Sequence, residues 1–234
     1  MKKSLYLLLL SLFALTGSTA AQQPAAGLKI MSLNVRVWTR DTDPEDPHYY
    51  KTRMEAMERM LLDQAPDIIC LQEMMIPIGR YVPDGYRKVG ISLRHPIYVR
   101  KDLKTSGYRY NLNWDSVICE GIRIFNVHSN WDRKVIERDI SDINAALNGP
   151  AVACGDWNNS LSVIRSIGLD MQEAGEFVEK PEGDTFTNFK DPEGSHGVID
   201  FFFLKDIRPA KYEMITDGYG AERISDHYPI MLTL

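Results

Sequence analysis

The feature that most constrains this chain is a set of polar residues placed where short apolar runs end. The clearest is Gly155-Asp156-Trp157-Asn158, which follows a Gly-Pro turn at 149–150 and the apolar run 151–154. An apolar run that ends in Gly and an acid predicts a buried strand leading into a loop. Side chains two residues apart in extended chain share a face, so Asp156 and Asn158 can reach one ligand. Taken alone, these residues also fit an Asx-rich turn.

Other segments repeat the pattern of a polar residue at the end of, inside or just before an apolar run. The polar residues are Asn34 after the run from Lys29, Glu73 after the run from Pro66, His128 after the run from Ile122, Asp200 inside the run 198–203, and Asp226-His227 before the run that ends at Leu234. An unpaired charge on a buried strand is strongly unfavourable. One shared polar site that gathers all these side chains accounts for them together, and we expect the fold to form it.

The order of apolar and amphipathic runs predicts packed sheets covered by helices. Helices are expected over 50–64, 133–147 and 160–167, and strands over 29–35, 66–73, 96–100, 116–119, 122–128, 151–154, 198–204 and 228–234. Glu120-Gly121 is a two-residue hairpin signal, and 76–90 and 175–192 are expected to be loops. No repeat or internal linker interrupts this order, which favours one domain over 29–234.

The first 21 residues have the pattern of a secretory signal peptide. Lys2 and Lys3 precede an apolar core over 5–15, and small residues suited to cleavage follow at 16–21. The apolar core is too short for a stable membrane span. Ser18 stands where a lipoprotein would need Cys, so the expectation is a secreted or periplasmic protein, with 22–28 as a linker to the domain.

The charge and the cysteines restrict the class of partner. The formal net charge is −5, and cleavage after residue 21 removes two further positive charges, Lys2 and Lys3. Nucleic-acid binding proteins normally present a basic face, so the basic residues between Arg80 and Lys101 form either a local patch for phosphates or a solvated face. Cys70, Cys119 and Cys154 all lie in apolar runs, which favours buried thiols over a disulfide framework or a zinc site.

Six segments, taken in order, carry a resemblance to a known family. They are Leu33-Asn34, Leu71-Gln72-Glu73, Asn126-Val127-His128, Gly155-Asp156-Trp157-Asn158, Ile199-Asp200-Phe201 and Ser225-Asp226-His227. This series resembles the ordered motifs of the endonuclease/exonuclease/phosphatase superfamily, over nearly all of residues 28–234. The resemblance implies a DNase I-like α/β fold, a four-layer α/β sandwich of two packed mixed β-sheets flanked by helices, and metal-dependent hydrolysis of phosphate esters.

The resemblance also implies roles for the residues. Glu73, assisted by Asn34, is expected to hold Mg²⁺ or Mn²⁺, which suits a cation that binds few carboxylates and keeps water. Asp200 and Asp226 are expected to hold a second ion or to balance charge.

The remaining roles concern the reaction itself. Asp156 is expected to orient or deprotonate the attacking water, and Asn158 to bind that water or the phosphate. His227, held by Asp226, is expected to stabilise developing charge. His128 is expected to contact phosphate, although Ile91-Ser92-Leu93 lacks the acid with which DNase-like members orient this histidine.

We therefore expect a secreted, metal-dependent phosphodiesterase with nuclease-like chemistry. The alternatives are a phosphomonoesterase or a phospholipid or sugar-phosphate phosphodiesterase with the same site, and a non-catalytic binding module. The substrate class stays open among nucleic acid, nucleotide, lipid headgroup and sugar phosphate. The acidic charge and the absence of a basic, aromatic insertion for a DNA groove favour a small substrate. A monomeric protein is also expected.

Overall fold

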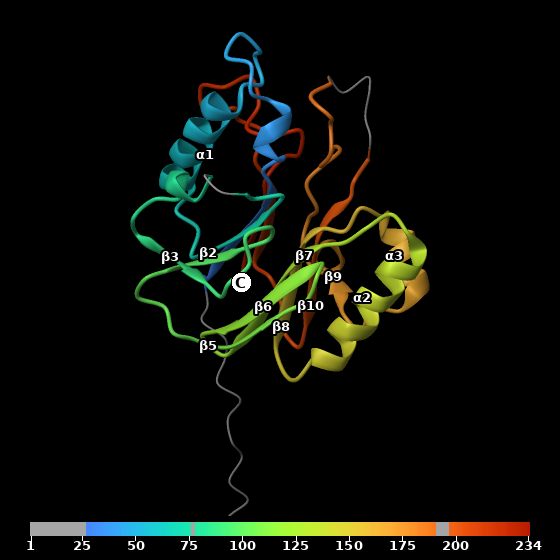
Figure 1. Ribbon diagram of the computed structural model, residues 1–234. Coiled ribbons are helices and arrows are strands. Elements are labelled where there is room, and N and C mark those ends of the chain that lie inside the picture. Colours follow the sequence, from blue (N-terminus) through green and yellow to red (C-terminus); the bar gives the residue numbers. More distant parts are fainter. Residues whose placement is uncertain (1–26, 76–77, 191–196) are drawn as a thin grey trace, which may run out of the picture.

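Two six-stranded sheets packed face to face form the centre of the protein, as a computed structural model of residues 27–75, 78–190 and 197–234 shows (Figure 1). The predicted signal peptide 1–21 and positions 22–26 of the predicted linker lie outside the described residues. Leu28, the last linker position, is buried in the core. All described helices and strands lie between Lys29 and Thr233, so removal of residues 1–21 takes none of them away.

The first sheet has the order β11-β12-β1-β2-β4-β3. Its strands are β1 (Lys29–Asn34), β2 (Ile68–Gln72), β3 (Tyr86–Val89), β4 (Ile97–Arg100), β11 (Lys211–Met214) and β12 (Ile230–Thr233). β1 and β2 run parallel with Asn34 beside Gln72. Because parallel strands end at the same edge of a sheet, Asn34 and the residue after Gln72, Glu73, lie at one edge.

The second sheet has the order β5-β6-β7-β8-β10-β9. Its strands are β5 (Thr105–Tyr110), β6 (Trp114–Cys119), β7 (Ile122–His128), β8 (Ala151–Asp156), β9 (Gln172–Glu173) and β10 (Asp200–Lys205). β7 and β8 are parallel, with His128 beside Asp156, and β10 is antiparallel to β8, with Asp200 beside Asp156. The register alone therefore places three of the predicted site residues in one row.

Helices cover the outer face of each sheet. α1 (Tyr50–Gln64) packs Met54, Met57 and other apolar residues on the first sheet, whereas α2 (Arg133–Ala146) and α3 (Leu161–Ile167) pack on the second. A third cluster of buried residues fills the space between the sheets. The predicted four-layer α/β sandwich of two mixed sheets flanked by helices is confirmed.

The helix ends follow from local sequence. α1 stops where Ala65 adopts a left-handed conformation directly before Pro66, which cannot continue a helix. α2 starts at Asp132, whose side chain accepts a hydrogen bond from the backbone N–H of Lys134. Three short 3₁₀ turns complete the chain: η1 (Trp38–Arg40), η2 (Ile78–Tyr81) and η3 (Ala174–Glu176).

The expected strands and helices are all present, with ends shifted by a few residues. Four further strands, β3, β5, β9 and β11, were not expected, and β3 lies in the segment 76–90 that was interpreted as a loop. Cys70, Cys119 and Cys154 are free and buried, which agrees with the interpretation as unpaired thiols. Among the described helices, none has the length and apolar character needed to cross a membrane.

Candidate active site

The candidate site lies where strand ends of the two sheets meet. The ends of β1 and β2 bring Asn34 and Glu73 from the first sheet, and the ends of β7, β8 and β10 bring His128, Asp156 and Asp200 from the second. Asn34, Asp156 and Asp200 are almost fully buried, whereas Glu73 and His128 are partly exposed. The site thus has a buried floor and an open side.

The carboxylate of Asp156 is the centre of this floor. Its Oδ2 accepts a hydrogen bond from Asn34 Nδ2 at 3.0 Å, and its Oδ1 accepts one from the backbone N–H of Asn158 at 2.8 Å. The Nε2 atoms of His128 and His227 lie 3.7 and 3.8 Å from Oδ2. One buried oxygen therefore faces two imidazole rings and one amide.

His227 is held by Asp200 and not by Asp226. Its Nδ1 lies 2.9 Å from Asp200 Oδ2, and both side chains are buried. The prediction that Asp226 orients His227 is wrong. Asp226 lies at a bend in a loop, where side-chain direction does not follow the alternation of a strand, and its carboxylate faces other partners.

Asp226 instead binds Arg36, a residue that the sequence analysis did not single out. Arg36 donates through one terminal nitrogen to Asp226 Oδ2 at 2.6 Å and through Nε to Asp41 Oδ2 at 3.0 Å. Asp41 also accepts from the fully buried Arg53 at 2.7 Å. Asp200 and Asp226 thus have separate partners in the protein, and the expectation that they hold a second ion or balance charge stays a prediction. The only sequence signal for Arg36 is its place two residues after Asn34.

Glu73 stands at the open side of the site. Its Oε2 accepts the backbone N–H of Val37 at 2.9 Å, and its Oε1 accepts from Asn34 Nδ2 at 3.3 Å and lies 3.9 Å from His128 Nε2. In the described part of the chain, Glu73 has no Lys or Arg partner. Its carboxylate is therefore available to a cation.

Asn158 supports the loop after β8. Its backbone N–H donates to Asp156, and its Nδ2 donates to the backbone oxygen of Ser129 at 3.0 Å. Ser129 in turn donates through Oγ to the buried Asp139 at 2.7 Å. Asn158 therefore fixes the loop that follows His128 to the loop that follows Asp156.

Three non-glycine residues of the site have left-handed backbones. The φ angles are 54° at Arg36, 54° at Glu73 and 50° at Asn158. Such conformations cost energy for residues with a Cβ and concentrate at functional sites. Each one occurs within two residues of a strand end.

A buried amide pair links the two sheets beneath the site. Gln72 Nε2 donates to Asn126 Oδ1 at 2.6 Å, and Asn126 Nδ2 donates to the backbone oxygen of Leu71 at 2.9 Å. Both side chains are fully buried. The pair fixes the distance between β2 and β7. It thereby fixes the distance between Glu73, directly after Gln72, and His128, two residues after Asn126.

The surroundings change the acidity of the three central groups. Burial raises the pKa of Asp156 to about 7, although the positive charge of His227 lowers it and Asp200 raises it. Burial lowers the pKa of His227, but the charge of Asp200 and its hydrogen bond raise it more, to about 10. Burial lowers the pKa of His128 despite the opposite effect of Glu73. Near neutral pH, His227 is a cation, His128 is neutral and Asp156 is poised to gain or lose a proton.

The carboxylate and amide oxygens of the site are the groups that could bind a divalent metal. Within residues 27–75, 78–190 and 197–234, no three or more His, Cys, Asp or Glu side chains are grouped to hold a metal ion. Mg²⁺ does not need such a group, because it binds through one or two carboxylates and keeps several waters. The partly exposed carboxylate of Glu73 fits that requirement. The Oδ1 of Asn34 accepts the N–H of Arg36 at 2.9 Å, so the amide oxygen of Asn34 reaches a metal only if the amide turns.

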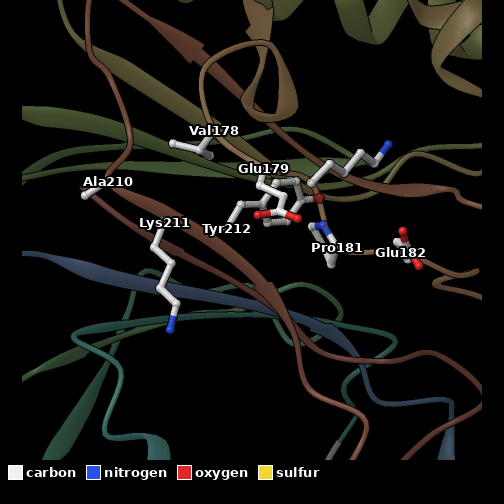
Figure 2. A pocket seen from close by; sticks show the side chains of 8 residues that line it. Val178, Glu179, Pro181, Glu182, Ala210, Lys211 and Tyr212 are labelled. Carbon is white, nitrogen blue, oxygen red and sulfur yellow. The ribbon is translucent and has the colours of Figure 1, made fainter.

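A separate cavity of about 380 Å³ lies between the segment 178–182 and β11 (Figure 2). Its charged lining residues are two acids and two lysines: Glu179, Lys180, Glu182 and Lys211. None of the site residues described above lines it. The balanced charge of its wall provides no concentrated binding potential for a phosphate.

Comparison with known proteins decides the family. The model of the endonuclease/exonuclease/phosphatase family matches residues 31–227. The chain belongs to this family. Members of the family are phosphoric ester hydrolases, and the match extends from β1 to His227, so it includes every residue of the candidate site.

Solved structures of family members share the fold. A family protein from Bacteroides vulgatus is 16% identical with a TM-score of 0.70, covering 88% of this chain and 98% of that chain. A mannosyl-6-phosphatase from Bacteroides thetaiotaomicron is 18% identical with a TM-score of 0.68 and the same coverage. TDP2 from D. rerio, solved with a single-strand DNA product, is 19% identical with a TM-score of 0.67, again over 88% and 98%. No curated protein matches the chain in sequence.

Proposed function

We propose that this family member is a secreted phosphodiesterase that depends on a divalent metal and uses Asp156 as the base for water attack. The observation that carries the proposal is the convergence of Nε2 of His128 and Nε2 of His227 on Oδ2 of the buried Asp156. An arrangement of one carboxylate and two imidazoles at an open edge can move a proton and balance charge on phosphate.

Asp156 suits the role of base. A general base works best when its pKa is near the operating pH, and burial raises the pKa of Asp156 to about 7. Hydrogen bonds from Asn34 and from the N–H of Asn158 hold the carboxylate in one orientation. In the proposed step, Asp156 accepts a proton from water while the water oxygen bonds to phosphorus and the bond to the leaving oxygen breaks.

His227 suits the role of cation. Its Nδ1 donates to Asp200, which leaves the Nε2–H directed toward Asp156 and the open space beside it. A protonated ring there donates a hydrogen bond to a phosphoryl or leaving oxygen as negative charge develops. Mg²⁺ or Mn²⁺ bound at Glu73 would add Lewis-acid stabilisation of a phosphate oxygen.

The charge of the site favours a diester over a monoester. Arg36 is neutralised by Asp41 and Asp226, and His227 is paired with Asp200, while Glu73 and Asp156 bring further negative charge. A phosphomonoester carries about two negative charges at pH 7, whereas a diester carries one. The site therefore repels a monoester more strongly, and a single divalent ion suffices to offset a diester.

Phosphomonoester hydrolysis is the second candidate. It is favoured by the similarity in fold to the mannosyl-6-phosphatase. A non-catalytic role is disfavoured because Glu73, Asp156, Asp200 and His227 are all present and form one connected site. Secretion or periplasmic location rests on the pattern of residues 1–21 and is part of the proposal, as is a monomeric state.

The test compares a chromogenic phosphodiester, a chromogenic phosphomonoester and plasmid DNA as substrates of residues 22–234. Each is measured with Mg²⁺, with Mn²⁺ and with EDTA, for the wild type and for His227→Ala. The proposal predicts faster diester than monoester cleavage, and loss of both with EDTA or with His227→Ala. Faster monoester cleavage supports the second candidate, and no cleavage of any substrate contradicts the hydrolase.

A further inference from the structure

The exposed large apolar side chains are gathered on a few segments that border the candidate site. The described residues contain seven such side chains, and six of them lie on the segments 73–75, 90–95, 110–113 and 129–132. The six are Met75, Ile91, Leu93, Tyr110, Leu112 and Trp131, with exposed fractions from 42% to 80%, and are named the apolar rim. The seventh, Leu62, lies on α1.

Hydrogen bonds join the segments that carry Ile91, Leu93, Tyr110 and Leu112. The buried His95 places its Nε2 2.9 Å from the backbone oxygen of Leu112, and the N–H of Ile91 donates to the hydroxyl of Tyr108 at 3.2 Å. Tyr108 in turn stacks with Tyr110, with 6.1 Å between ring centroids. These contacts hold the segments that carry the four apolar side chains next to one another.

The remaining two members are attached to the same surface. The N–H of Met74, beside Met75, donates to the backbone oxygen of Arg94 at 2.9 Å. Asn113 and Ser129 both donate to Asp139, which fixes the loop of Trp131 to the loop of Leu112. All six side chains thus lie on segments that are joined to one another, and neighbouring exposed apolar side chains mark interaction surfaces.

The apolar rim adjoins the open side of the catalytic site. Met75 is two residues after Glu73, and Trp131 is three residues after His128. The backbone N–H of His128 donates to the oxygen of Asn113, the residue that follows Leu112. Whatever binds this rim is therefore held next to the carboxylate and imidazole that face the phosphate.

The charges on these segments indicate the partner. Over these segments and the residues beside them, 90–95, 108–113 and 129–137, the exposed charged side chains are four cations and two acids: Arg94, Arg109, Arg133, Lys134, Asp132 and Glu137. Arg133 pairs with Glu137 at 2.8 Å, and the partly exposed Glu73 adds one acid beside Met75. Arg94 and Arg109 have no acidic partner among the described residues. Apolar side chains with interspersed cations bind the boundary between the headgroups and acyl chains of an anionic membrane.

We infer that the apolar rim docks on an anionic phospholipid surface and presents lipid-borne phosphate to the site. Four of its six side chains are aliphatic and offer no face for a base to stack on, whereas a single-strand nucleic-acid site relies on aromatic faces in a basic groove. The catalytic consequence of docking rests on the proposed function, but docking itself does not.

Vesicle binding tests the inference directly. Residues 22–234 are sedimented with vesicles of phosphatidylcholine alone and with about 30% phosphatidylglycerol added. The wild type should bind the anionic vesicles more tightly than the vesicles of phosphatidylcholine alone, and high salt should weaken the binding. The triple variant Ile91→Ser, Leu93→Ser, Leu112→Ser should lower the partition coefficient by about ten-fold or more. Leu62→Ser, which removes an equally exposed leucine from α1, should leave it unchanged.

The fluorescence of Trp131 supplies a second readout. Trp131 is 80% exposed, whereas Trp38 is half-buried and Trp114 and Trp157 are buried. Docking should therefore shift the emission of Trp131 to the blue and allow its quenching by brominated lipid. Trp131→Phe should remove this change. All variants should keep the thermal unfolding midpoint and the rate on a soluble diester, because the changed side chains are exposed and lie outside the catalytic groups.

Six outcomes separate the possibilities. Absence of vesicle binding, equal binding by the triple variant, or equal loss with Leu62→Ser overturns the inference. Binding of a single-strand oligonucleotide that requires the rim, without vesicle binding, also overturns it. Rim-dependent vesicle binding without hydrolysis of any ester supports docking and contradicts the proposed function. Hydrolysis of a soluble diester without vesicle binding supports the proposed function and contradicts docking.

Discussion

Nδ1 of His227 lies 2.9 Å from Oδ2 of Asp200, and both side chains are shielded from solvent. A carboxylate in this position fixes the imidazole so that Nε2 carries the proton that faces the substrate, and it keeps the ring charged. The neighbouring Asp226 is occupied with Arg36. The two acids of this region therefore have different effects that can be separated by mutation.

The first prediction concerns Asp200→Asn. Removing this charge takes away the main influence that raises the pKa of His227, so that the pKa falls from about 10 toward its ordinary value of 6.5. At two pH units above the lowered pKa, about one molecule in a hundred keeps the protonated ring. The rate at pH 8.5 should fall about a hundred-fold, with a smaller loss at pH 6.

The matched control is Asp226→Asn. This variant breaks the ion pair with Arg36 but keeps the hydrogen bond between His227 and Asp200. Its alkaline limit of activity should stay near that of the wild type. Profiles of kcat/KM against pH for both variants decide the point, and an unchanged alkaline limit in Asp200→Asn contradicts the assigned role of Asp200.

The second prediction is a bell-shaped pH profile for the wild type. Asp156 must lose its proton to act as a base, so the rate rises as the pH passes its pKa of about 7. His227 must keep its proton, so the rate falls as the pH passes about 10. A divalent ion at Glu73 adds positive charge beside Asp156 and shifts the acidic limit to lower pH. Initial rates at saturating and limiting Mg²⁺ measure this shift, and a profile without an alkaline limit rules out a catalytic imidazolium.

The third prediction is that Asp156→Asn stabilises the fold while it abolishes turnover. The pKa of Asp156 is raised from 3.8 to about 7, so the folded state binds its proton more tightly than the unfolded state. Burial of the ionised carboxylate therefore costs nothing below pH 3.8 and has its full cost above pH 7.

Urea unfolding measures this effect. The variant should be more stable than the wild type by about 2 kcal/mol at pH 8, with no gain at pH 3.5. His227 stays paired with Asp200 in both proteins. The attraction between the charge of His227 and Asp156 is already included in the pKa of Asp156. Equal stability at pH 8 would mean that the charge of Asp156 is fully compensated in the folded protein.

The central strands could be predicted from the sequence, whereas the sheet edges could not. The four unexpected strands, β3, β5, β9 and β11, are the edges of the two sheets. Strands inside a sheet have both faces covered and show apolar runs such as Phe201-Phe202-Phe203, which are buried. An edge strand is partly solvated, so β5 reads Thr-Ser-Gly-Tyr-Arg-Tyr and resembles a loop in sequence.

The candidate site likewise has a part that the sequence predicts and a part that it does not. The residues on strand ends lie together as expected. The register of β10 and β7 on β8 places Asp200 and His128 on either side of Asp156. The partner of His227 was predicted incorrectly, because the choice between Asp200 and Asp226 depends on side-chain direction at a loop. Arg36 and the apolar rim were missed because their meaning comes from residues far apart in sequence, such as Arg36 and Asp226.

The fourth prediction is that Glu73→Gln weakens metal binding with little effect on the fold. Glu73 is partly exposed and has no Lys or Arg partner in the described part of the chain, so losing its charge removes a ligand without breaking an ion pair with either cation. The Mg²⁺ concentration for half-maximal rate should rise by at least about ten-fold. Titration with Mn²⁺ should show the same loss without any substrate present. Glu45→Gln, at an exposed position outside the site, serves as the control and should change neither value.

The fifth prediction tests the backbone on which Asp156 depends. Gly155 has a φ of 142°, and a Cβ at this position would lie 1.9 Å from the backbone oxygen of Val127 on the neighbouring strand. Backbone atoms inside a sheet cannot move aside, so Gly155→Ala should separate β8 from β7 locally and destabilise the protein by more than about 3 kcal/mol.

Gly121→Ala provides the matched control for this change. Gly121 also has a left-handed φ, 85°, but a Cβ added to it in the hairpin turn would meet nothing within 4 Å. Its substitution should cost only the strain of a left-handed alanine, about 1 kcal/mol. Urea unfolding of both variants separates backbone strain from steric overlap. Equal losses of unfolding free energy in the two variants would show that the close approach of β7 to Gly155 adds no steric cost.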